Sequence, residues 1–528
     1  RNADGSEKAY SLEASAMAGS GGLVFAGAGV SAQASENGEV NIAVTSGNNL
    51  TAGKAVDIAA LNAPAVKAVT GALSGSLLAS AAVTVAQANI GTKGKALKTS
   101  VTIGDNNVLA AETISVKAET NAKQDVDMQA LSISASPFPG GAAQINSGGS
   151  SIYSDVTVDA GSNVYRGKAL GGNNYGAADL LLEAGNSVSQ KVRASGISAG
   201  TAFATGTNLA ATQAVLTTKV TAAGSKAGSH INDLTVNAKS YAAIDSEANG
   251  YGGALIDISP YAAKVENEYR ADTDVELSGD WTTDGVVTAG AINGSDIDLH
   301  ADAVRAAVVG GSGVWLKNDV SNAANVAVKD AKITSNGAQV YTAQNNVDHT
   351  GKIDASGYGG VNVNASDLND AFAFTAGVTV DKSELTALGN SGSITAQALT
   401  QGTINSTNSL KSAGLVPVSL AASKHKLVYD NSVDITGSTL KTAKKDQDIT
   451  LAASDDTEVR LETIADTQGG AVGAASARAE NELARSNKLK VDGNSYLEST
   501  NDVNLYAGAN SGGINSSLGL EVLADAYN

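Results

Sequence analysis

Apolar and polar residues alternate in a five-residue pattern that recurs along most of the chain. From Leu234 to Ala238 the order is apolar, polar, apolar, polar, alanine, and copies of this order begin near residues 114, 180, 234, 297, 361, 449 and 503. The apolar positions of the copies are Ile114 and Val116, Leu180 and Leu182, Leu234 and Val236, Ile297 and Leu299, Val361 and Val363, Ile449 and Leu451, and Val503 and Leu505. Recurrence of one strand-like motif at such intervals is typical of a stacked repeat protein.

Further alternating segments lie about 20 residues apart within each interval, for example at Leu234, Leu255 and Val275. Two-residue alternation indicates half-buried strands, and the intervening Gly, Asn, Asp and Ser residues supply turns. A unit of about 20 residues cannot bury its apolar face alone and is stabilised by stacking on its neighbours. The pattern therefore predicts an all-β fold, an elongated parallel β-helix (β-solenoid) of about 20-residue rungs, with no separate globular domain. Roughly 26 such rungs at about 4.8 Å would form a rod roughly 120 Å long.

Residues 1–113 carry the pattern less regularly than residues 114–528, and we interpret the two regions as one continuous solenoid. The sequence opens at Arg1 without Met, and the strand pattern continues to Val522. We therefore expect the chain to be an excerpt of a longer filament. The segment Ala474–Ala484 is the strongest candidate for a helix, because Ala, Arg and Glu favour helices.

Four asparagines stand eight residues before an apolar, polar, apolar triplet: Asn267, Asn318, Asn345 and Asn481. Asparagine tolerates the left-handed backbone region, and in stacked strands its amide also forms ladders with the amide above. We expect a structural turn or stacking role for these four residues, rather than a glycan or ion site.

Composition favours a thin core that repeats many times. Hydrophobic residues make up 42% of the chain but aromatic residues only 4%, so most apolar side chains are small. A thick globular core usually contains more of the aromatic residues, which bury the most area each. There are 58 Gly and only 5 Pro, so few residues interrupt a backbone ladder.

The net charge of −18 disfavours nucleic acid and anionic membranes as partners, because both are bound through Lys and Arg. The absence of cysteine excludes disulfides and thiolate metal sites. One stretch, Ala68–Thr92, carries no charged residue and is long enough to cross a bilayer. Its Ser, Thr, Gln, Asn and Gly residues make insertion unfavourable. We therefore expect two strands there and no membrane span.

Candidate catalytic groups are few. His230, His300, His349 and His425 are isolated from each other in the sequence, and we expect them to be scattered surface residues. Asp296 and Asp298 are two positions apart and would share one side of a strand. A glycosidase would need two such carboxylates at the right separation within a cleft. Acids recur before the repeats, at Asp179, Asp233, Asp296, Asp448 and Asp502, which favours a turn role over an active site that occurs once.

No sequence motif indicates a cofactor, and neither the calcium-binding nonapeptide array nor an EF-hand loop is present. We therefore predict no catalytic, cofactor-binding or metal site and expect that the protein is not an enzyme.

The recurring apolar pairs followed by alanine, together with double glycines such as Gly252-Gly253, resemble large bacterial filamentous adhesins. The resemblance is to the filamentous-haemagglutinin and leukotoxin-like group, and it covers residues 114–528 and, more loosely, 1–113. It implies secretion and display on the bacterial cell surface. It also implies a structural and adhesive role, in which a stiff filament reaches a glycan or matrix receptor on a host or neighbouring cell. Two alternatives stay open: a self-assembling extracellular fibre or sheath, and a β-helix polysaccharide lyase or hydrolase.

Overall fold

The computed structural model of the protein describes residues 10–135, 140–171, 174–513 and 518–527. Strands make up 84% of the residues in those ranges, and no helix occurs within them. The strands form a long parallel sheet, so the prediction of an all-β parallel architecture is confirmed. The helix candidate Ala474–Ala484 lies within strand β24 (Ala474–Asp492).

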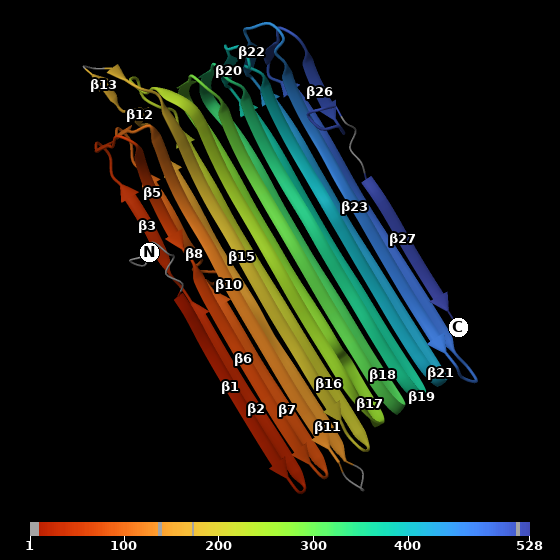
Figure 1. Cartoon of the computed structure of the whole chain (residues 1–528). Coiled ribbons are helices and arrows are strands. Elements are labelled where there is room, and N and C mark those ends of the chain that lie inside the picture. Colours follow the sequence, from red (N-terminus) through yellow and green to blue (C-terminus); the bar gives the residue numbers. More distant parts are fainter. Residues whose placement is uncertain (1–9, 136–139, 172–173, 514–517, 528) are drawn as a thin grey trace.

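Each coil has two long legs and one short leg, and β17 (Ile231–Thr283) contains all three. Its outgoing leg runs from Leu234 to Gly253, its return leg from Ala263 to Leu277, and its short leg from Gly279 to Thr283. Stacked on those of other coils, these legs form an outgoing sheet, a return sheet and a short row of strands (Figure 1).

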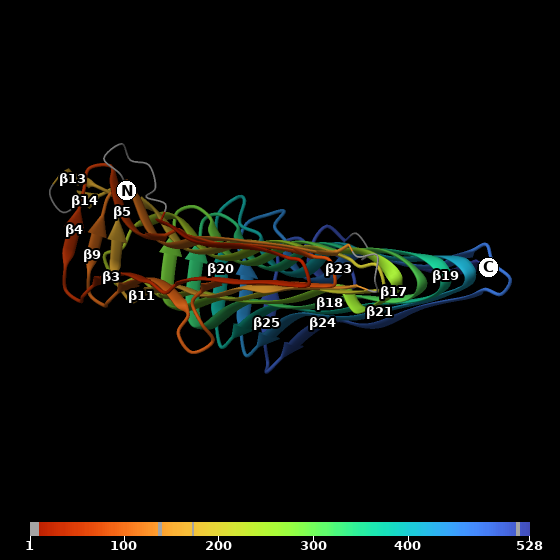
Figure 2. The ribbon, with the colours of Figure 1, turned by 90° about the horizontal axis from the view of Figure 1, so that it is seen from below.

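The two long edges of this solenoid differ in thickness. We call the edge where outgoing legs turn into return legs the thin edge, and the opposite edge, which carries the short row, the thick edge. Figure 2 shows the two long sheets diverging toward β4, β9, β20 and β25 and coming together toward the turns of β17 and β19.

The strands have the following bounds. Whole coils or their two long legs are formed by β17, β18 (Val287–Ser335), β19 (Gln339–Asp381) and β21 (Ile394–Thr436). The outgoing sheet also contains β1 (Tyr10–Gly22), β5 (Ala55–Asn62), β6 (Pro64–Ser76), β10 (Thr113–Ser134), β15 (Ala178–Ala199), β23 (Ile449–Gln468), β26 (Val503–Ala507) and β27 (Leu518–Tyr527). The return sheet also contains β2 (Phe25–Glu36), β3 (Glu39–Val44), β7 (Ala79–Ile90), β8 (Leu97–Ile103), β11 (Gly141–Ala160), β16 (Phe203–Ala223) and β24. The short row contains β4 (Asn49–Thr51), β9 (Val108–Ala110), β12 (Val164–Arg166), β20 (Glu384–Ala387), β22 (Thr439–Thr442) and β25 (Tyr496–Glu498), and an antiparallel pair is formed by β13 (Ala169–Gly171) and β14 (Asn174–Tyr175).

The pairing register shows a much longer coil than the sequence suggested. Asn267 pairs with Asn318, at a separation of 51 in the sequence, and Gln124 pairs with Gln190, at a separation of 66. The expected rung of about 20 residues is thereby corrected to a coil of 51 to 66 residues. A leg of about 20 residues already spans about 66 Å. Apolar segments recur on the outgoing leg, at the turn and on the return leg of one coil. The spacing of about 20 residues seen in the sequence is therefore the length of one leg and not of a whole coil.

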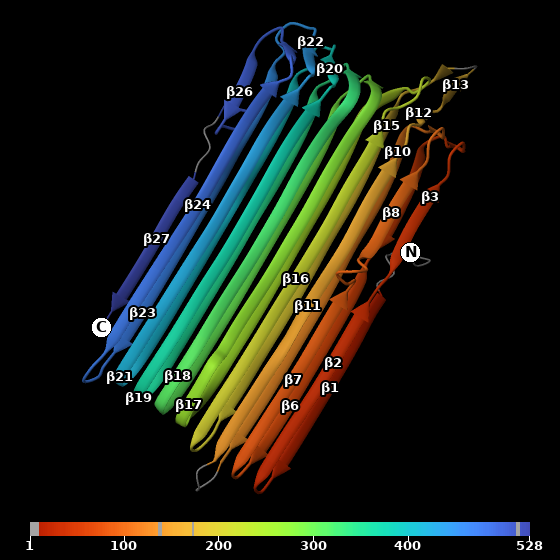
Figure 3. The same ribbon diagram turned by 180° about the vertical axis from the view of Figure 1, so that it is seen from behind.

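The described solenoid is consequently a broad plate and not a long rod. The ladder through Ile114 has nine members: Val56, Ile114, Leu180, Leu234, Val287, Gln339, Ile394, Ile449 and Val503. Eight steps of about 4.8 Å give a length along the axis of about 38 Å. From both sides the strands lie next to one another across the plate (Figure 1 and Figure 3). Strands before residue 114 pair directly with those after it, for example β5 and β6 with β10.

Five of the seven motif copies align in that one ladder, and two do not. Ile297 pairs with Ile244 instead, although it and Leu299 are still buried. Val361 pairs with Val309 at the thin edge, and both Val361 and Val363 lie on the outer surface. The interior positions there are Asn362 and Asn364. This corrects the expected inward position of Val361 and Val363, and the reason is that a shift of one residue exchanges the two sides of a strand.

Two large apolar clusters fill most of the described interior, and a third, small one is formed by Ala28, Ala72, Ala82 and Ala130. Near the thick edge, residues of all three layers pack together, and the rings of Tyr165 and Trp281 stack with centroids 6.3 Å apart. Toward the thin edge the second cluster lies between the two long sheets alone. Ile114, Val116, Leu180, Leu182, Leu234, Val236, Ile449 and Leu451 belong to the first cluster, whereas Ile297 and Leu299 belong to the second.

A row of buried polar side chains, here called the polar row, separates the two clusters. Its members are Thr99, Thr120, Asn186, Thr218, Ser240, Thr273, Asn293, Asn345, Thr400, Asn431 and Asp455. Asn293 Nδ2 donates to Asn345 Oδ1 in the next coil at 3.0 Å, and Thr400 Oγ1 donates to Asn431 Oδ1 across the interior at 2.8 Å. Hydrogen bonding of this kind offsets the unfavourable burial of amide and hydroxyl groups.

We predict that Val236→Asp destabilises the plate by about 3–5 kcal/mol, because it places an unpaired carboxylate among apolar neighbours. Val236 is 0% exposed within its ladder. The matched variant Val363→Asp introduces the same charge at a side chain that is 45% exposed. Its free energy of unfolding should lie within about 0.5 kcal/mol of that of wild type. Thermal unfolding followed by circular dichroism measures both. Similar unfolding temperatures for the two variants would contradict the register described above.

Candidate functional site

The four asparagines singled out in the sequence lie within strands and not at turns. Asn267 and Asn318 are ladder partners, and Asn267 Nδ2 donates to Asn318 Oδ1 at 2.7 Å. Asn481 continues the same ladder, whereas Asn345 belongs to the polar row of the outgoing sheet. None of the four has a positive φ; that conformation is taken outside glycine by Asn106, Asp330, Lys382, Asp446 and Asn494. The amide of Asn267 thus stacks on the amide of Asn318 in the next coil. This corresponds to the stacking role and not to the turn role.

The Asn267 ladder leads to a buried cluster of ionisable groups. Asp370 follows Asn318 in the ladder and His425 follows Asp370, while His349 faces them from the outgoing sheet. His425 Nε2 lies 3.0 Å and His349 Nε2 lies 3.6 Å from Asp370 Oδ2, and all three side chains are 0% exposed. Ser406 Oγ donates to the same oxygen at 2.6 Å. The expectation of scattered surface histidines is therefore wrong for His349 and His425.

This cluster holds a negative charge inside the plate. Burial alone would raise the pKa of Asp370, but hydrogen bonds and charge interactions with His349 and His425 outweigh burial and hold that pKa well below its usual range. Phe372 packs against both imidazole rings, with centroids 5.1 Å and 6.4 Å away. Within the described ranges no group of three or more His, Cys, Asp or Glu side chains is arranged to hold a metal ion. The cluster thus joins the two sheets through a buried carboxylate that contacts one histidine from each sheet.

We predict that Asp370→Asn lowers the unfolding free energy by about 3–5 kcal/mol at pH 7, since removal of one partner leaves buried polar groups uncompensated. The folded-state pKa of Asp370 lies below its unfolded value, so its contribution is present above pH about 4 and lost as the pH falls further. The difference from wild type should therefore shrink between pH 5 and pH 3 in thermal melts. Asp354→Asn, at a half-exposed carboxylate, is the matched control. An undiminished difference at pH 3 would contradict this role for Asp370.

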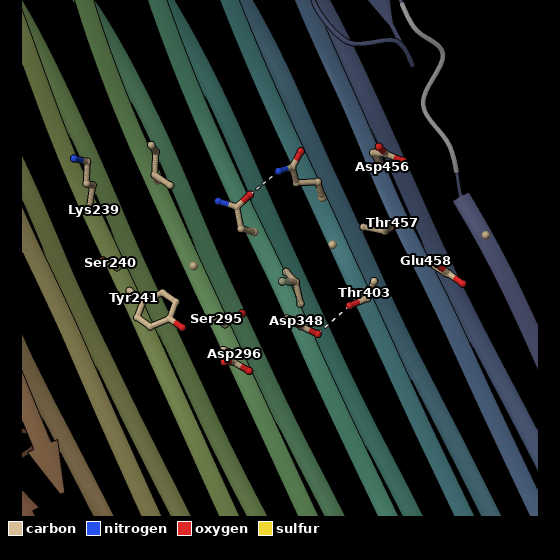
Figure 4. Close-up of a pocket in the computed structure, with 17 residues that line it drawn as sticks. Lys239, Ser240, Tyr241, Ser295, Asp296, Asp348, Thr403, Asp456, Thr457 and Glu458 are labelled. Carbon is tan, nitrogen blue, oxygen red and sulfur yellow. Dashed lines mark hydrogen bonds between the residues drawn. The ribbon is translucent and has the colours of Figure 1, made fainter.

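The outer surface of the outgoing sheet carries a shallow groove of about 1120 Å³. It crosses six neighbouring strands, from β17 through β18, β19, β21 and β23 to β27, which is about 24 Å along the axis. Figure 4 shows Tyr241, Asp296, Asp348, Thr403 and Glu458 side by side across these strands. The remaining polar side chains on its outer surface are Lys239, Asn346, Gln401 and Asp456, whereas the neighbouring Ser240, Ser295 and Thr457 are buried.

Glycines of the coils shape this groove. Gly294 stands next to Tyr241 in the ladder, and a Cβ at Gly294 would lie 2.8 Å from the Tyr241 ring. The missing side chain therefore lets the ring lie over the neighbouring coil. Gly402 has a φ of +137°, and a Cβ there would lie 1.7 Å from the carbonyl oxygen of Val347. Only glycine fits this bend of the backbone at the bottom of the groove.

Hydrogen bonds fix the polar side chains in the groove. Thr403 Oγ1 donates to Asp348 Oδ1 at 2.9 Å, and Gln401 Nε2 donates to Asn346 Oδ1 at 3.0 Å. Both bonds join β19 to β21, and Figure 4 marks them with dashed lines. The groove therefore presents amide, hydroxyl and carboxylate groups in a fixed order along the axis, with one aromatic ring at its β17 end.

Carboxylates in the groove stand close together. Asp296 and Asp348 are ladder partners on the outer surface. Burial raises the pKa of Asp296, and the charges of Asp348 and Asp298 raise it further. Burial likewise raises the pKa of Tyr241, with a smaller contribution from Asp296 and Asp348. The Tyr241 hydroxyl therefore stays protonated at neutral pH and remains a hydrogen-bond donor.

The recurring acids at the thick edge have the turn role that their periodicity indicated. Asp233 Oδ1 accepts a hydrogen bond from the backbone N–H of Val286 at 2.8 Å, and Asp448 Oδ1 accepts one from that of Asp502 at 3.1 Å. Asp179 Oδ1 accepts from Asn232 Nδ2 at 2.8 Å. Each carboxylate thus holds a loop of the next coil. Asp296 differs from them because it lies in the middle of the outgoing sheet.

The sequence drew attention to Asp296 but not to Tyr241, Asp348, Thr403 or Glu458. Tyr241, Asp348, Thr403 and Glu458 are far apart along the chain and become neighbours only through the register. Knowledge of the coil length would have aligned them, because equivalent positions then recur once per coil.

No protein-family model, curated protein or solved structure matches this chain. Among the described residues, no helix has the length and apolar character needed to cross a bilayer.

We predict that Asp348→Asn lowers the pKa of Asp296, because it removes a neighbouring negative charge. A raised folded-state pKa gives stability that is present below the unfolded value and lost as the pH rises through the folded value. The variant should therefore lose less stability than wild type between pH 4 and pH 7. Titration of ¹³C-labelled aspartate carboxyl signals measures the pKa. Asp354 lies beside Asp302 and not beside Asp296, so Asp354→Asn should leave the pKa of Asp296 unchanged.

Proposed function

We propose that this chain is a structural and adhesive segment of a secreted bacterial surface filament, which contacts a glycan on a host or neighbouring cell through the groove between Tyr241 and Glu458. The groove is the single observation on which the choice of ligand rests, because it combines a ring with ordered polar groups over about 24 Å. The filament and its location follow from the resemblance of the sequence to filamentous adhesins.

A rigid support favours this proposal. Binding sites work best when the supporting elements hold each side chain in place, and the groove residues stand on strands that are paired on both sides from β17 to β23. The interior beneath them is filled by the polar row and the second apolar cluster. A ligand that meets the outer surface therefore encounters a fixed pattern of groups and loses little affinity to their ordering.

The chemistry of the groove suits a neutral or cationic sugar chain. Carboxylate and amide oxygens accept hydrogen bonds from sugar hydroxyls, while Lys239, the amide nitrogens and the Thr403 and Tyr241 hydroxyls donate. The Tyr241 ring, 44% exposed, offers an apolar face to the C–H side of a sugar ring. The acids Asp296, Asp348, Asp456 and Glu458 disfavour an acidic polysaccharide.

We predict that Tyr241→Ala weakens binding to the best ligand of a glycan array at least tenfold, because the stacking surface is lost. Tyr496→Ala removes a similarly exposed ring on the short row, outside the groove, and should bind like wild type. Equal affinity of all three proteins would refute the groove as the contact. Release of shorter saccharides during incubation would indicate a polysaccharide lyase or hydrolase instead of an adhesin.

A self-assembling fibre is a second candidate, favoured by the coil at the C-terminal end. Val503 and Leu505 are 43% and 49% exposed, although their ladder partners Ile449 and Leu451 are 0% exposed. One more coil stacked on these strands would bury them, whether it comes from the same chain or, in a fibre, from another copy. Negative-stain images at rising protein concentration separate the two functions, because a fibre grows longer while an adhesive segment keeps its length.

A further inference from the structure

The thin edge reverses the usual arrangement of polar and apolar side chains. Nine of its outward residues are large and apolar, and their exposed fractions run from 41% to 66%: Phe203, Leu255, Ile258, Val308, Val309, Val361, Val363, Leu415 and Val472. Many inward residues of the same turns are polar and buried, and the other inward residues are mostly alanines such as Ala82, Ala204 and Ala262. The polar ones are Gln144, Asn146, Ser198, Asn208, Asp257, Ser259, Arg305, Ser312, Asn362, Asn364, Ser412 and Ser419. A water-facing surface has the opposite order, so this edge is built to meet an apolar medium.

Hydrogen bonds satisfy much of the polar interior of the edge. Asn208 Oδ1 accepts from both Gln144 Nε2 and Asn146 Nδ2 at 2.7 Å. Arg305 reaches Ser198 Oγ at 2.9 Å and Asp257 Oδ2 at 3.5 Å, and its guanidinium occupies the space that a side chain at Gly252 would take. Paired groups such as these are tolerated away from water. The polar side chains of the edge therefore bond to one another in the interior. The large apolar side chains of the same turns point outward.

Charged side chains are nearly absent from the outer surface of the edge. Residues 71–85, 195–208 and 355–366 contain no Asp, Glu, Lys or Arg, although the whole chain is 17% charged. Asp257 and Arg305, which do lie in these turns, are 1% and 3% exposed. The uncharged stretch Ala68–Thr92 is explained in the same way, because it forms the end of β6, the turn and β7.

The apolar surface covers both flanks of the edge as well as its tip. On the outgoing flank, Leu73, Ile197, Tyr251 and Val304 lie in one outer ladder. On the return flank, Phe203, Ile256, Val309 and Val361 lie in another. Because the two sheets come together there (Figure 2), the edge is a convex wedge. A second rigid plate could cover only one flank, whereas a fluid apolar phase covers both flanks and the tip.

Aromatic side chains stand along the wedge, at Tyr251, Tyr261, Trp315 and Tyr358. Tyr261 and Trp315 pack together with ring centroids 4.8 Å apart. Tyrosine and tryptophan have an apolar body and a polar tip, and they are enriched where a protein meets the boundary between lipid and water.

We infer that the thin edge inserts into the interfacial layer of a net-neutral lipid bilayer, so that the plate stands on the membrane with its thick edge in water. Neutral lipid is specified because the wedge carries almost no cationic side chain and the chain as a whole carries −18. On the return flank alone eight neighbouring strands, from β2 to β21, contribute to the wedge, which is about 34 Å long. The groove between Tyr241 and Glu458 remains on the exposed outer surface of the outgoing sheet.

Co-sedimentation with phosphatidylcholine vesicles tests the inference. Wild type should partition onto the vesicles equally at about 0.1 M and about 1 M salt, since no charge attraction is involved. Phe203→Asp combined with Ile258→Asp should reduce the partition coefficient at least tenfold. The matched pair Val286→Asp and Leu388→Asp, which are 39% and 40% exposed near the thick edge, should bind like wild type. Tyr241→Ala should also bind like wild type, so failure of the glycan site and failure of the lipid site are separate results.

A measurement on the unmodified protein complements the variants. The chain has two tryptophans, Trp281 in the thick-edge core and Trp315 on the wedge. Lipids brominated on their acyl chains should quench the emission of Trp315 and leave that of Trp281. Absence of quenching together with absence of sedimentation would overturn the inference. So would dimers in light scattering without lipid that the Phe203→Asp and Ile258→Asp pair abolishes, because the edge would then join two copies of the chain.

Discussion

The parallel register is the constraint on which the structure depends. In a parallel stack each side chain has as its nearest neighbours the equivalent residues of the coils before and after, about 4.8 Å away. An interior position must therefore hold similar residues in successive coils. Val158, Val220, Val275 and Val326 illustrate this in the thick-edge core, and the polar row illustrates it for hydroxyl and amide groups. Where a charge enters, as at Asp370, its partners come from the adjacent coil and from the opposite sheet.

The plate changes character along the length of each leg. Near the thick edge the interior is apolar and the loops outside are polar, as in most proteins in water. Beyond the polar row the interior becomes mixed, and at the thin edge polar residues and alanines lie inside while large apolar residues lie outside. One coil thus passes through three environments within about 66 Å. The groove lies between these extremes, on the outer side of the polar row and the residues next to it.

The sequence predicted the layers of the fold but not their dimensions. Period-two alternation at Leu234 and Val236 correctly placed them inside, because alternation is a local property of a strand. The coil length could not be read from the same signal, since both long legs of one coil carry it. Val361 and Val363 were assigned inward because they look like Leu234 and Val236, and only the register shows that Asn362 and Asn364 take the interior. His349, Asp370 and His425 were unrelated in the sequence, and their contact depends on two coils and two sheets. The residues of the groove were missed for the same reason.

The direction of the backbone hydrogen bonds has a mechanical consequence. In this plate they run along the solenoid axis, so a pull along that axis loads the bonds between two coils simultaneously. β18 and β19, for example, are paired along almost their whole lengths. A pull applied at one corner of a coil instead would open the pairs one after another, at a much smaller force. A tether built from such coils would therefore resist steady tension between its ends and yield to sideways peeling.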